Sequence, residues 1–178
     1  MKIFTADRET GTIIDQFETI ENAMKAINDY EEIDMKNGDY TPDFYDIVNE
    51  DNISLIDSPE VNLVEQMYRL RKRSDQLAMD LRVVFMFMED LKEERNPNKI
   101  KKKTRYFEGV QNKFKENFSF VMFILNRANE YANECMETYT TNDQKRISKY
   151  LDEINSHKKK FDYLNNLYHE RVLQVEIQ

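Results

Sequence analysis

Residues 63–91 read LVEQMYRLRKRSDQLAMDLRVVFMFMEDL. Apolar side chains recur in this stretch at alternating steps of four and three, and the stripe comprises Leu63, Met67, Leu70, Ser74, Leu77, Leu81, Val84, Met88 and Leu91. This spacing is that of a heptad repeat and predicts one long helix with the stripe on a single face. Ser74 is the one polar member, so we expect its hydroxyl to find a hydrogen-bond partner in the core.

Helix-start and helix-stop residues delimit this helix. Ser58 followed by Pro59 predicts an N-cap and a first helical position, because proline lacks only an N–H that has no intrahelical partner there. At the other end, Asn96-Pro97-Asn98 interrupts the helix, since the residue before a proline is pushed out of the helical region. We therefore expect a helix from 58 to about 95.

Two further helices follow with the same spacing. The second starts near Lys99, and its apolar stripe comprises Phe107, Val110, Phe114, Phe118, Val121, Leu125, Ala128, Ala132, Cys135 and Tyr139. The stripe of the third comprises Ile147, Leu151, Ile154, Phe161, Leu164, Tyr168, Val172 and Val175. Thr141 with Gln144 matches a capping box at the start of the third helix. Because the connections are short, neighbouring helices must run antiparallel, which predicts an elongated three-helix bundle.

The first 57 residues have a different pattern. Residues 2–7 and 12–17 are predicted strands of a hairpin, and 44–48 is a third short strand. Thr19 is the expected N-cap of an intervening helix that Gly38 ends. The apolar face of that helix comprises Ala23, Ala26, Ile27, Tyr30 and Ile33. The pattern predicts a ββαβ unit.

The predicted fold class is α+β, mainly α. A small ββαβ domain at 1–57, here called the head, precedes the three-helix bundle at 58–178, and the boundary lies in the polar segment 49–57. The head contains four Lys/Arg and fifteen Asp/Glu, a net charge of −11, while the rest of the chain carries the remaining +3 of the total of −8. Such asymmetry concerns partners and solubility rather than fold.

Several classes of protein are disfavoured by the sequence. A single cysteine, Cys135, excludes an internal disulfide and indicates either a reducing compartment or an inert buried thiol. The chain turns polar directly after Met1, which predicts no signal peptide. The longest apolar run, 118–125, is far below the ~18 residues that a membrane span needs. We expect a soluble intracellular protein without a membrane partner.

Motifs for catalysis and metal binding are missing from the sequence. His157 and His169 lie over three turns apart on one helix, and no cysteine or second histidine has ligand spacing, which argues against zinc. With three glycines, the chain contains no phosphate-binding loop and no nucleophile elbow. We predict no enzyme, no metal site and no cofactor.

Three basic runs lie on the predicted helices. They are candidate phosphate-binding residues and comprise Arg69, Arg71, Lys72 and Arg73; Lys99, Lys101, Lys102 and Lys103; and Lys158, Lys159 and Lys160. The first and third runs fall at a similar height of the bundle. The sequence favours the alternative that these side chains keep long helices soluble, and a third interpretation is that they receive the acidic head, within one chain or in a second copy.

Two segments, 83–88 and 118–125, are apolar on nearly every side. Most such residues are core, but the phenylalanines exceed what one narrow stripe can bury, and they are Phe85, Phe87, Phe120 and Phe123. Any of these phenylalanines that remain exposed would mark an association surface, so a homodimer is an alternative to a monomer.

Carboxylates and aromatic rings alternate in the second half of the head. The candidate partner-binding residues are Asp39, Tyr40, Asp43, Phe44, Tyr45, Asp46 and Glu50. Carboxylates spaced like phosphates predict docking on a basic nucleic-acid-binding groove of another protein. The alternative is a soluble surface over buried rings.

The head also resembles a known group of proteins. The stretches that carry the resemblance are TADRETGT at 5–12, FETIENA at 17–23, YEE at 30–32 and YTPDFYDIV at 40–48. They are similar to modules at the front of small accessory proteins of phages and conjugative elements of low-GC Gram-positive bacteria, some of which are anti-CRISPR inhibitors of Cas9. The resemblance covers the first third of the chain, identifies no catalytic residue, and implies the cytoplasm of a bacterial host cell.

Together these features predict a non-enzymatic mobile-element protein that binds and inhibits a host defence or nucleic-acid-processing protein. The sharpest form is an anti-CRISPR protein that occludes the basic nucleic-acid site of a Cas9-type effector or its guide RNA complex. The alternatives are a nucleic-acid-binding or regulatory protein that uses the basic runs, and a self-associating structural helical protein.

Overall fold

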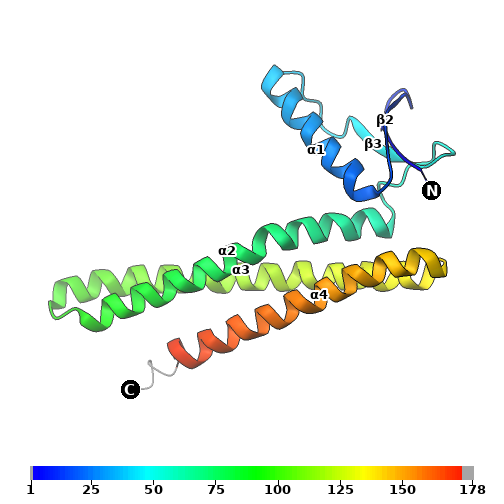
Figure 1. Ribbon diagram of the computed structural model, residues 1–178. Helices are drawn as coiled ribbons and strands as arrows, with labels where there is room; N and C mark the ends of the chain where they lie inside the picture. Colours follow the sequence, from blue (N-terminus) through cyan, green and yellow to red (C-terminus); the bar gives the residue numbers. More distant parts are fainter. Residues whose placement is uncertain (1, 174–178) are drawn as a thin grey trace.

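The computed structural model describes residues 2–173, apart from the side chains of residues 142 and 173. It is an α+β fold, mainly α, with a small antiparallel sheet and four α-helices (Figure 1). The elements are β1 (Ile3–Asp7), β2 (Ile13–Phe17), α1 (Ile20–Asn37), β3 (Tyr45–Val48), α2 (Pro59–Glu93), α3 (Pro97–Thr138), α4 (Thr141–Tyr168) and a closing π-helical turn, His169–Leu173.

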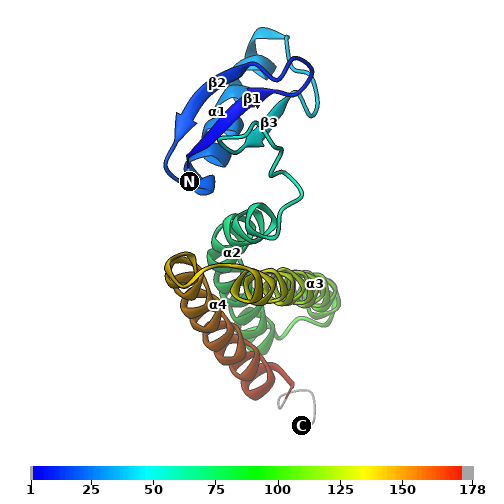
Figure 2. The ribbon, with the colours of Figure 1, turned by 90° about the vertical axis from the view of Figure 1, so that its right-hand side faces the viewer.

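The head contains β1, β2, α1 and β3 in the predicted order. The sheet order is β2-β1-β3, both pairings are antiparallel, and α1 covers one face (Figure 2). Thr19 caps α1 by accepting a hydrogen bond from the Asn22 amide, and Gly38 ends the helix at φ 83°, as predicted. The hairpin turn uses Gly11 at φ 68°, a conformation that glycine adopts without strain.

The core of the head extends beyond its own elements. Its buried apolar residues are Ile3, Ile20, Ala23 and Ile47 together with Val61 and Val64 of α2. The first turns of α2 therefore complete a core that the head alone cannot close. One predicted core residue, Ile33, is 53% exposed, because the last turns of α1 extend past the edge of the sheet.

The heptad stripe of α2 is buried as predicted, from Leu63 to Met88, with Leu91 half-buried at the end. Ser58 caps the helix by accepting a hydrogen bond from the Val61 amide, and Pro59 is the first helical residue. Ser74 is 2% exposed and accepts a hydrogen bond from Lys160 Nζ at 2.9 Å, which satisfies its hydroxyl.

Two helix starts differ from prediction. The helix α3 begins at Pro97 rather than near Lys99, because Asn96 caps it by accepting from the amides of residues 98 and 99. The prediction of a capping box at Thr141 and Gln144 is wrong, because the N-cap of α4 lies one residue earlier. Thr140 is the N-cap, its hydroxyl donates to Asp143 at 2.9 Å, and the Gln144 amide reaches back to a carbonyl of α3.

Pairs of contacts fix the directions of the long helices. Asp90 and Asp80 of α2 contact Lys103 and Asn117 of α3, so these two helices run antiparallel. Three ion pairs join α2 to α4, namely Glu60–Arg146, Arg71–Glu153 and Asp75–Lys160. From one pair to the next, the residue number increases on both helices, so α2 and α4 run in the same direction. The α2–α3 loop lies at the end of the helices away from the head (Figure 1).

One continuous apolar core joins α2, α3 and α4, here called the body. Its fully buried large side chains include Met67 and Leu77 of α2, Phe114 of α3 and Phe161 of α4. Phe85 and Phe87 pack against this core, whereas Phe120 and Phe123 are exposed. Val175, predicted for the stripe of α4, lies outside the described residues.

Candidate functional site

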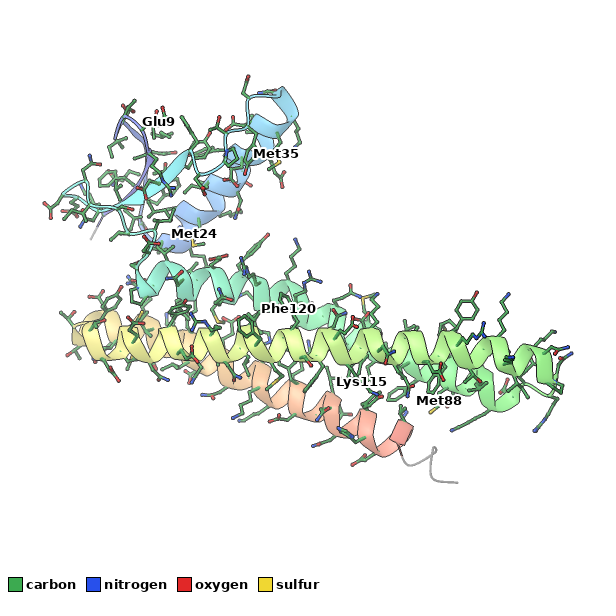
Figure 3. All side chains as sticks on the ribbon, turned by 180° about the vertical axis from the view of Figure 1, so that it is seen from behind. Glu9, Met24, Met35, Met88, Lys115 and Phe120 are labelled. Carbon is green, nitrogen blue, oxygen red and sulfur yellow. The ribbon has the colours of Figure 1, made fainter. Side chains whose placement is uncertain are left out.

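The far end of the head carries exposed apolar side chains beside carboxylates. We call this surface the distal corner, and it comprises Ile33, Met35, Asp39, Tyr40 and Asp43. Met35 is 56% exposed and Tyr40 39%, and Figure 3 shows Met35 at the end of α1 that points away from the body. Ile33 and Met35 are two positions apart on α1 and point to different sides of it, so the distal corner presents separate exposed apolar groups among carboxylates rather than one apolar patch.

Local backbone geometry creates this corner. The left-handed Gly38 ends α1, and the Asp39 amide then donates to the Asp34 carbonyl at 2.9 Å. Asp43 has φ 58°, a region that aspartate enters more readily than most residues because its short side chain bonds locally. The turn therefore leaves the carboxylates of Asp39 and Asp43 exposed.

Three aromatic rings, those of Tyr30, Phe44 and Tyr45, pack together next to the distal corner. The Tyr45 hydroxyl donates to Asp34 Oδ2 at 2.6 Å, and this hydrogen bond raises the pKa of Tyr45 to about 12. The Tyr45 ring lies 5.3 Å from Tyr30 and meets Phe44 edge-on at 5.0 Å. Phe44 and Tyr45, predicted to contact a partner, are half-buried supports of the loop.

Two predicted carboxylates lie elsewhere. Asp46 is 9% exposed, and its Oδ1 accepts from the Ser54 hydroxyl at 2.8 Å and from the Ile47 amide at 2.7 Å. This carboxylate belongs to the interior of the head rather than to its accessible surface, which corrects the sequence-based assignment. Glu50 is exposed beside the chain start, where it accepts from the Lys2 amide at 2.7 Å.

The charge of the head faces solvent. Eleven of its fifteen acidic residues are exposed, namely Glu9, Asp15, Glu18, Glu21, Asp29, Glu32, Asp39, Asp43, Glu50, Asp51 and Asp57. Because like charges on one small domain repel, this distribution opposes the compactness of the head.

A polar joint connects the head to the body. Arg71 Nε and Nη2 donate to both oxygens of Glu153 at 2.7 and 2.9 Å, while Nη1 donates to Glu21 of α1 at 2.5 Å. The hydrogen bond to Glu153 is the main cause of the raised pKa of Arg71. The Tyr150 hydroxyl donates to Glu21 at 3.1 Å. Arg71, predicted to bind phosphate, thus bridges three helices.

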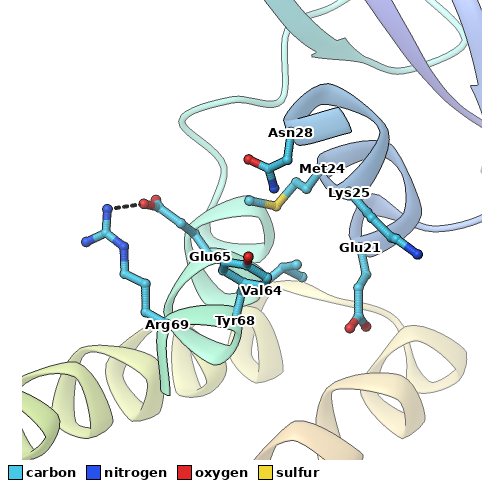
Figure 4. Close-up of a pocket in the computed structure, with 8 residues that line it drawn as sticks. All are labelled: Glu21, Met24, Lys25, Asn28, Val64, Glu65, Tyr68 and Arg69. Carbon is cyan, nitrogen blue, oxygen red and sulfur yellow. Dashed lines mark ion pairs between the residues drawn. The ribbon is translucent and has the colours of Figure 1, made fainter. Parts of the chain in front are cut away.

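Beside this joint, α1 and α2 leave a hollow of about 430 Å³ (Figure 4). Met24 lines it from α1, and Val64 and Tyr68 line it from α2. The Glu65–Arg69 ion pair lies on its rim. The head is joined to the body by this polar joint and by the apolar contacts of Val61 and Val64.

The basic runs divide into paired and exposed members. Lys160 contacts Ser74 and Asp75, and Lys103 contacts Asp90 and Glu94 at 3.2 and 3.1 Å. As predicted, the first and third runs lie at the same height, but their inner members serve helix packing. The members open to solvent are Lys72, Arg73, Lys99, Lys101, Lys102, Lys158 and Lys159.

An ion pair between a buried carboxylate and a partly exposed arginine joins the starts of α2 and α4. Glu60 is 2% exposed, and its two oxygens lie 2.6 and 2.8 Å from Arg146 Nη2. Burial raises the pKa of Glu60, and Arg146 opposes that shift. Burial also raises the pKa of the nearby Cys135 thiol to about 12, so this cysteine is not a reactive nucleophile.

Neither a cluster of metal ligands nor a membrane-spanning helix occurs in the part of the chain that the structure describes. Among residues 2–173, no three His, Cys, Asp or Glu side chains gather closely enough to hold a metal ion. Nor does any helix within that range combine the length and apolar character needed to cross a membrane.

No protein-family model, curated protein or solved structure compared with the chain matches it.

Proposed function

We propose that this chain is a non-enzymatic protein of a mobile element that binds and inhibits a host nucleic-acid-processing protein. The observation that supports this proposal is the distal corner, where the end of α1 and the loop after it expose the carboxylates of Asp39 and Asp43 together with Tyr40 and Met35. The sharpest form is an anti-CRISPR protein against a Cas9-type effector.

The mechanism follows from the chemistry of the head. A nucleic-acid channel presents Lys and Arg side chains that neutralise phosphates, and the exposed carboxylates supply the same charge. Tyr40 and Met35 add apolar contact that phosphates lack, which slows dissociation once the charges have guided association. The head occupies the channel and excludes the nucleic acid.

In this proposal, the head at 1–57 and the body at 58–178 are two domains that meet where Val61 and Val64 of α2 enter the core of the head. The body is an elongated antiparallel three-helix bundle. The shared apolar core of α2, α3 and α4 supports this architecture. The bundle holds the head at one end and adds bulk that blocks the approach to the channel. The setting is the cytoplasm of a bacterial host cell.

A charge-reversal experiment tests the proposal. Asp39→Lys is combined with Asp43→Asn, because asparagine tolerates the positive φ of residue 43 whereas lysine does not. The matched control, Asp152→Lys with Asp162→Asn, makes the same charge change at exposed positions of α4. Binding to a Cas9-type effector, with and without guide RNA, is measured at low and high salt.

We expect the head variant to bind at least about tenfold more weakly in low salt, and the difference to shrink in high salt, because screening removes the charge attraction. The control variant should bind like the unmodified protein. Equal binding by all three proteins would contradict the assignment of the distal corner.

A further inference from the structure

The exposed face of α3 carries aromatic rings beside cations. Tyr106 is 54% exposed, Phe120 43% and Phe123 59%. The Arg73 guanidinium lies 5.6 Å from the Phe120 ring centre, and Lys102 Nζ lies 5.9 Å from the Tyr106 ring centre. These distances are in the range of cation–π contacts.

Helix periodicity places these groups in one line. Positions 106, 113, 120 and 127 follow at steps of seven, which is close to two turns, so they share a face. From Lys102 to Arg127 the line extends about 38 Å along α3. We call it the aromatic–cation stripe, and it comprises Arg73, Lys102, Tyr106, Lys113, Phe120, Phe123 and Arg127.

The stripe lies opposite α4. The α4 side of α3 is identified by Gln111, which contacts the Tyr168 hydroxyl, and by Lys115, whose ammonium lies over the Tyr168 ring. In Figure 3, α3 lies in front of α4, with Phe120 midway along it. The stripe is therefore open along its length, and it lies on a different part of the molecule from the distal corner.

Two cations of the stripe have no acidic neighbour in the described part of the chain. Among the ion pairs of residues 2–173, none includes Arg73 or Lys102. Lys113 contacts buried Asp80 at 3.6 Å, and Arg127 contacts Glu130 at 2.7 Å. The stripe thus offers two cations that contact rings but form no ion pair in the described residues, and two that a ligand would share with carboxylates.

We propose that the aromatic–cation stripe binds single-stranded nucleic acid. Exposed rings stack on bases and neighbouring cations contact the phosphates, which is the combination that sequence-independent single-strand binding uses. Phe120 and Phe123 form the centre of the stripe. They are three residues apart, a rise of about 4.5 Å along the helix, so neighbouring bases can contact both rings. Double-stranded nucleic acid binds more weakly, because its bases stack on one another and leave no face for the rings.

Fluorescence anisotropy of the full chain with a labelled single-stranded RNA of about 16 nucleotides tests this assignment. Phe120→Ala with Phe123→Ala should raise the dissociation constant at least about tenfold, since stacking accounts for that much per base. Phe120→Tyr should retain binding because it keeps a ring. The matched control is Tyr163→Ala, which removes a 64% exposed ring from α4 and should leave binding unchanged.

A charge test accompanies the ring test. Arg73→Gln should reduce the slope of log affinity against log salt by about one unit, whereas Lys158→Gln on α4 should not. The assay contains no partner protein, so its result is independent of the proposed role of the head.

Three outcomes would overturn the proposal: no anisotropy change at about 0.05 M salt, an equal loss on Tyr163→Ala, or duplex binding as tight as single-strand binding. If Phe120→Ala with Phe123→Ala weakens binding to a Cas9-type effector but leaves RNA binding unchanged, the stripe is a protein-docking face instead.

Discussion

The head and the body use the same charged residue types in opposite ways. In the head, most carboxylates are exposed, and Glu32 pairs with Lys36 only through an exposed contact. In the body, carboxylates such as Glu60 and Glu153 are paired across helices with Arg146 and Arg71. The charge of the body thus helps to hold helices together, whereas the charge of the head opposes its own compactness.

The two regions also differ in how they close their cores. The body buries a continuous stripe on each of three long helices, while the head has a small cluster that needs Val61 and Val64 from α2. A small domain buries a smaller fraction of its surface, so the head depends on its attachment.

The largest effect should come from the core of the body. Met67 is fully buried and Met79 is 59% exposed on the same helix, so they form a matched pair. Met67→Ala should lower the free energy of unfolding by about 2–5 kcal/mol, because it removes apolar contact and leaves a cavity. Met79→Ala should change it by less than about 0.5 kcal/mol. Urea unfolding measures both free energies. Equal losses for the two variants would contradict the assignment of the heptad stripe of α2 to the buried face.

The dependence of the head on α2 gives the next largest effect. Val64 is 4% exposed in the head core, and Val83 on the same helix is 37% exposed. Val64→Ala should cost about 1–3 kcal/mol and increase amide exchange mainly in β1 and α1. Val83→Ala should cost little. Exchange that rises uniformly through the body would show that the two cores are not distinct.

The polar joint should contribute less. Arg71→Ala removes hydrogen bonds to Glu21 and Glu153 but leaves groups that are partly solvated, so we expect a loss of about 1 kcal/mol. Lys72→Ala, at the neighbouring exposed position, should change stability by less than about 0.5 kcal/mol. The Arg71 variant should also show a broader range of head–body distances in spin-label measurements, whereas the Lys72 variant should not.

The smallest effect concerns pH. Burial lowers the pKa of His157 below its ordinary 6.5, although nearby Glu153 opposes the shift. The unfolded chain therefore takes up a proton at this residue at higher pH than the folded chain does, so stability falls as the pH drops below 6.5. His157→Gln should reduce the difference in unfolding free energy between about pH 7.5 and about pH 5.5 by less than about 1 kcal/mol. An unchanged pH dependence would contradict the role of His157.

Local patterns predicted much of the fold. The heptad spacing of α2, the Ser58-Pro59 start and the Thr19 and Gly38 caps were confirmed because each rests on chemistry within a few residues. The same kind of signal was available at Asn96-Pro97, but we interpreted that proline as a stop rather than as the first residue of α3. Thr140 was not predicted as the N-cap of α4, because Thr141 beside it carries the same capping side chain.

The candidate site was less predictable, since it depends on where elements meet. The sequence identified Asp39, Tyr40 and Asp43 as exposed head residues, but periodicity placed Ile33 in the core. It also could not show that the Asp46 carboxylate faces Ser54, a contact that tertiary folding creates. Likewise, the sequence alone did not reveal the aromatic–cation stripe, because Arg73 and Phe120 come from different helices.

The central claim is that the carboxylates of the head serve binding and those of the body serve stability. The most direct measurement is the urea unfolding free energy of two matched double variants, Asp39→Asn with Asp43→Asn in the head and Glu60→Gln with Glu153→Gln in the body. We expect the head variant to be unchanged or slightly more stable, because repulsion is relieved. The body variant should lose about 1–3 kcal/mol, because buried Glu60 gives up its charge pairing with partly exposed Arg146 and Arg71 loses its pairing with Glu153. A comparable loss in both variants, or a greater loss in the head, would contradict the claim.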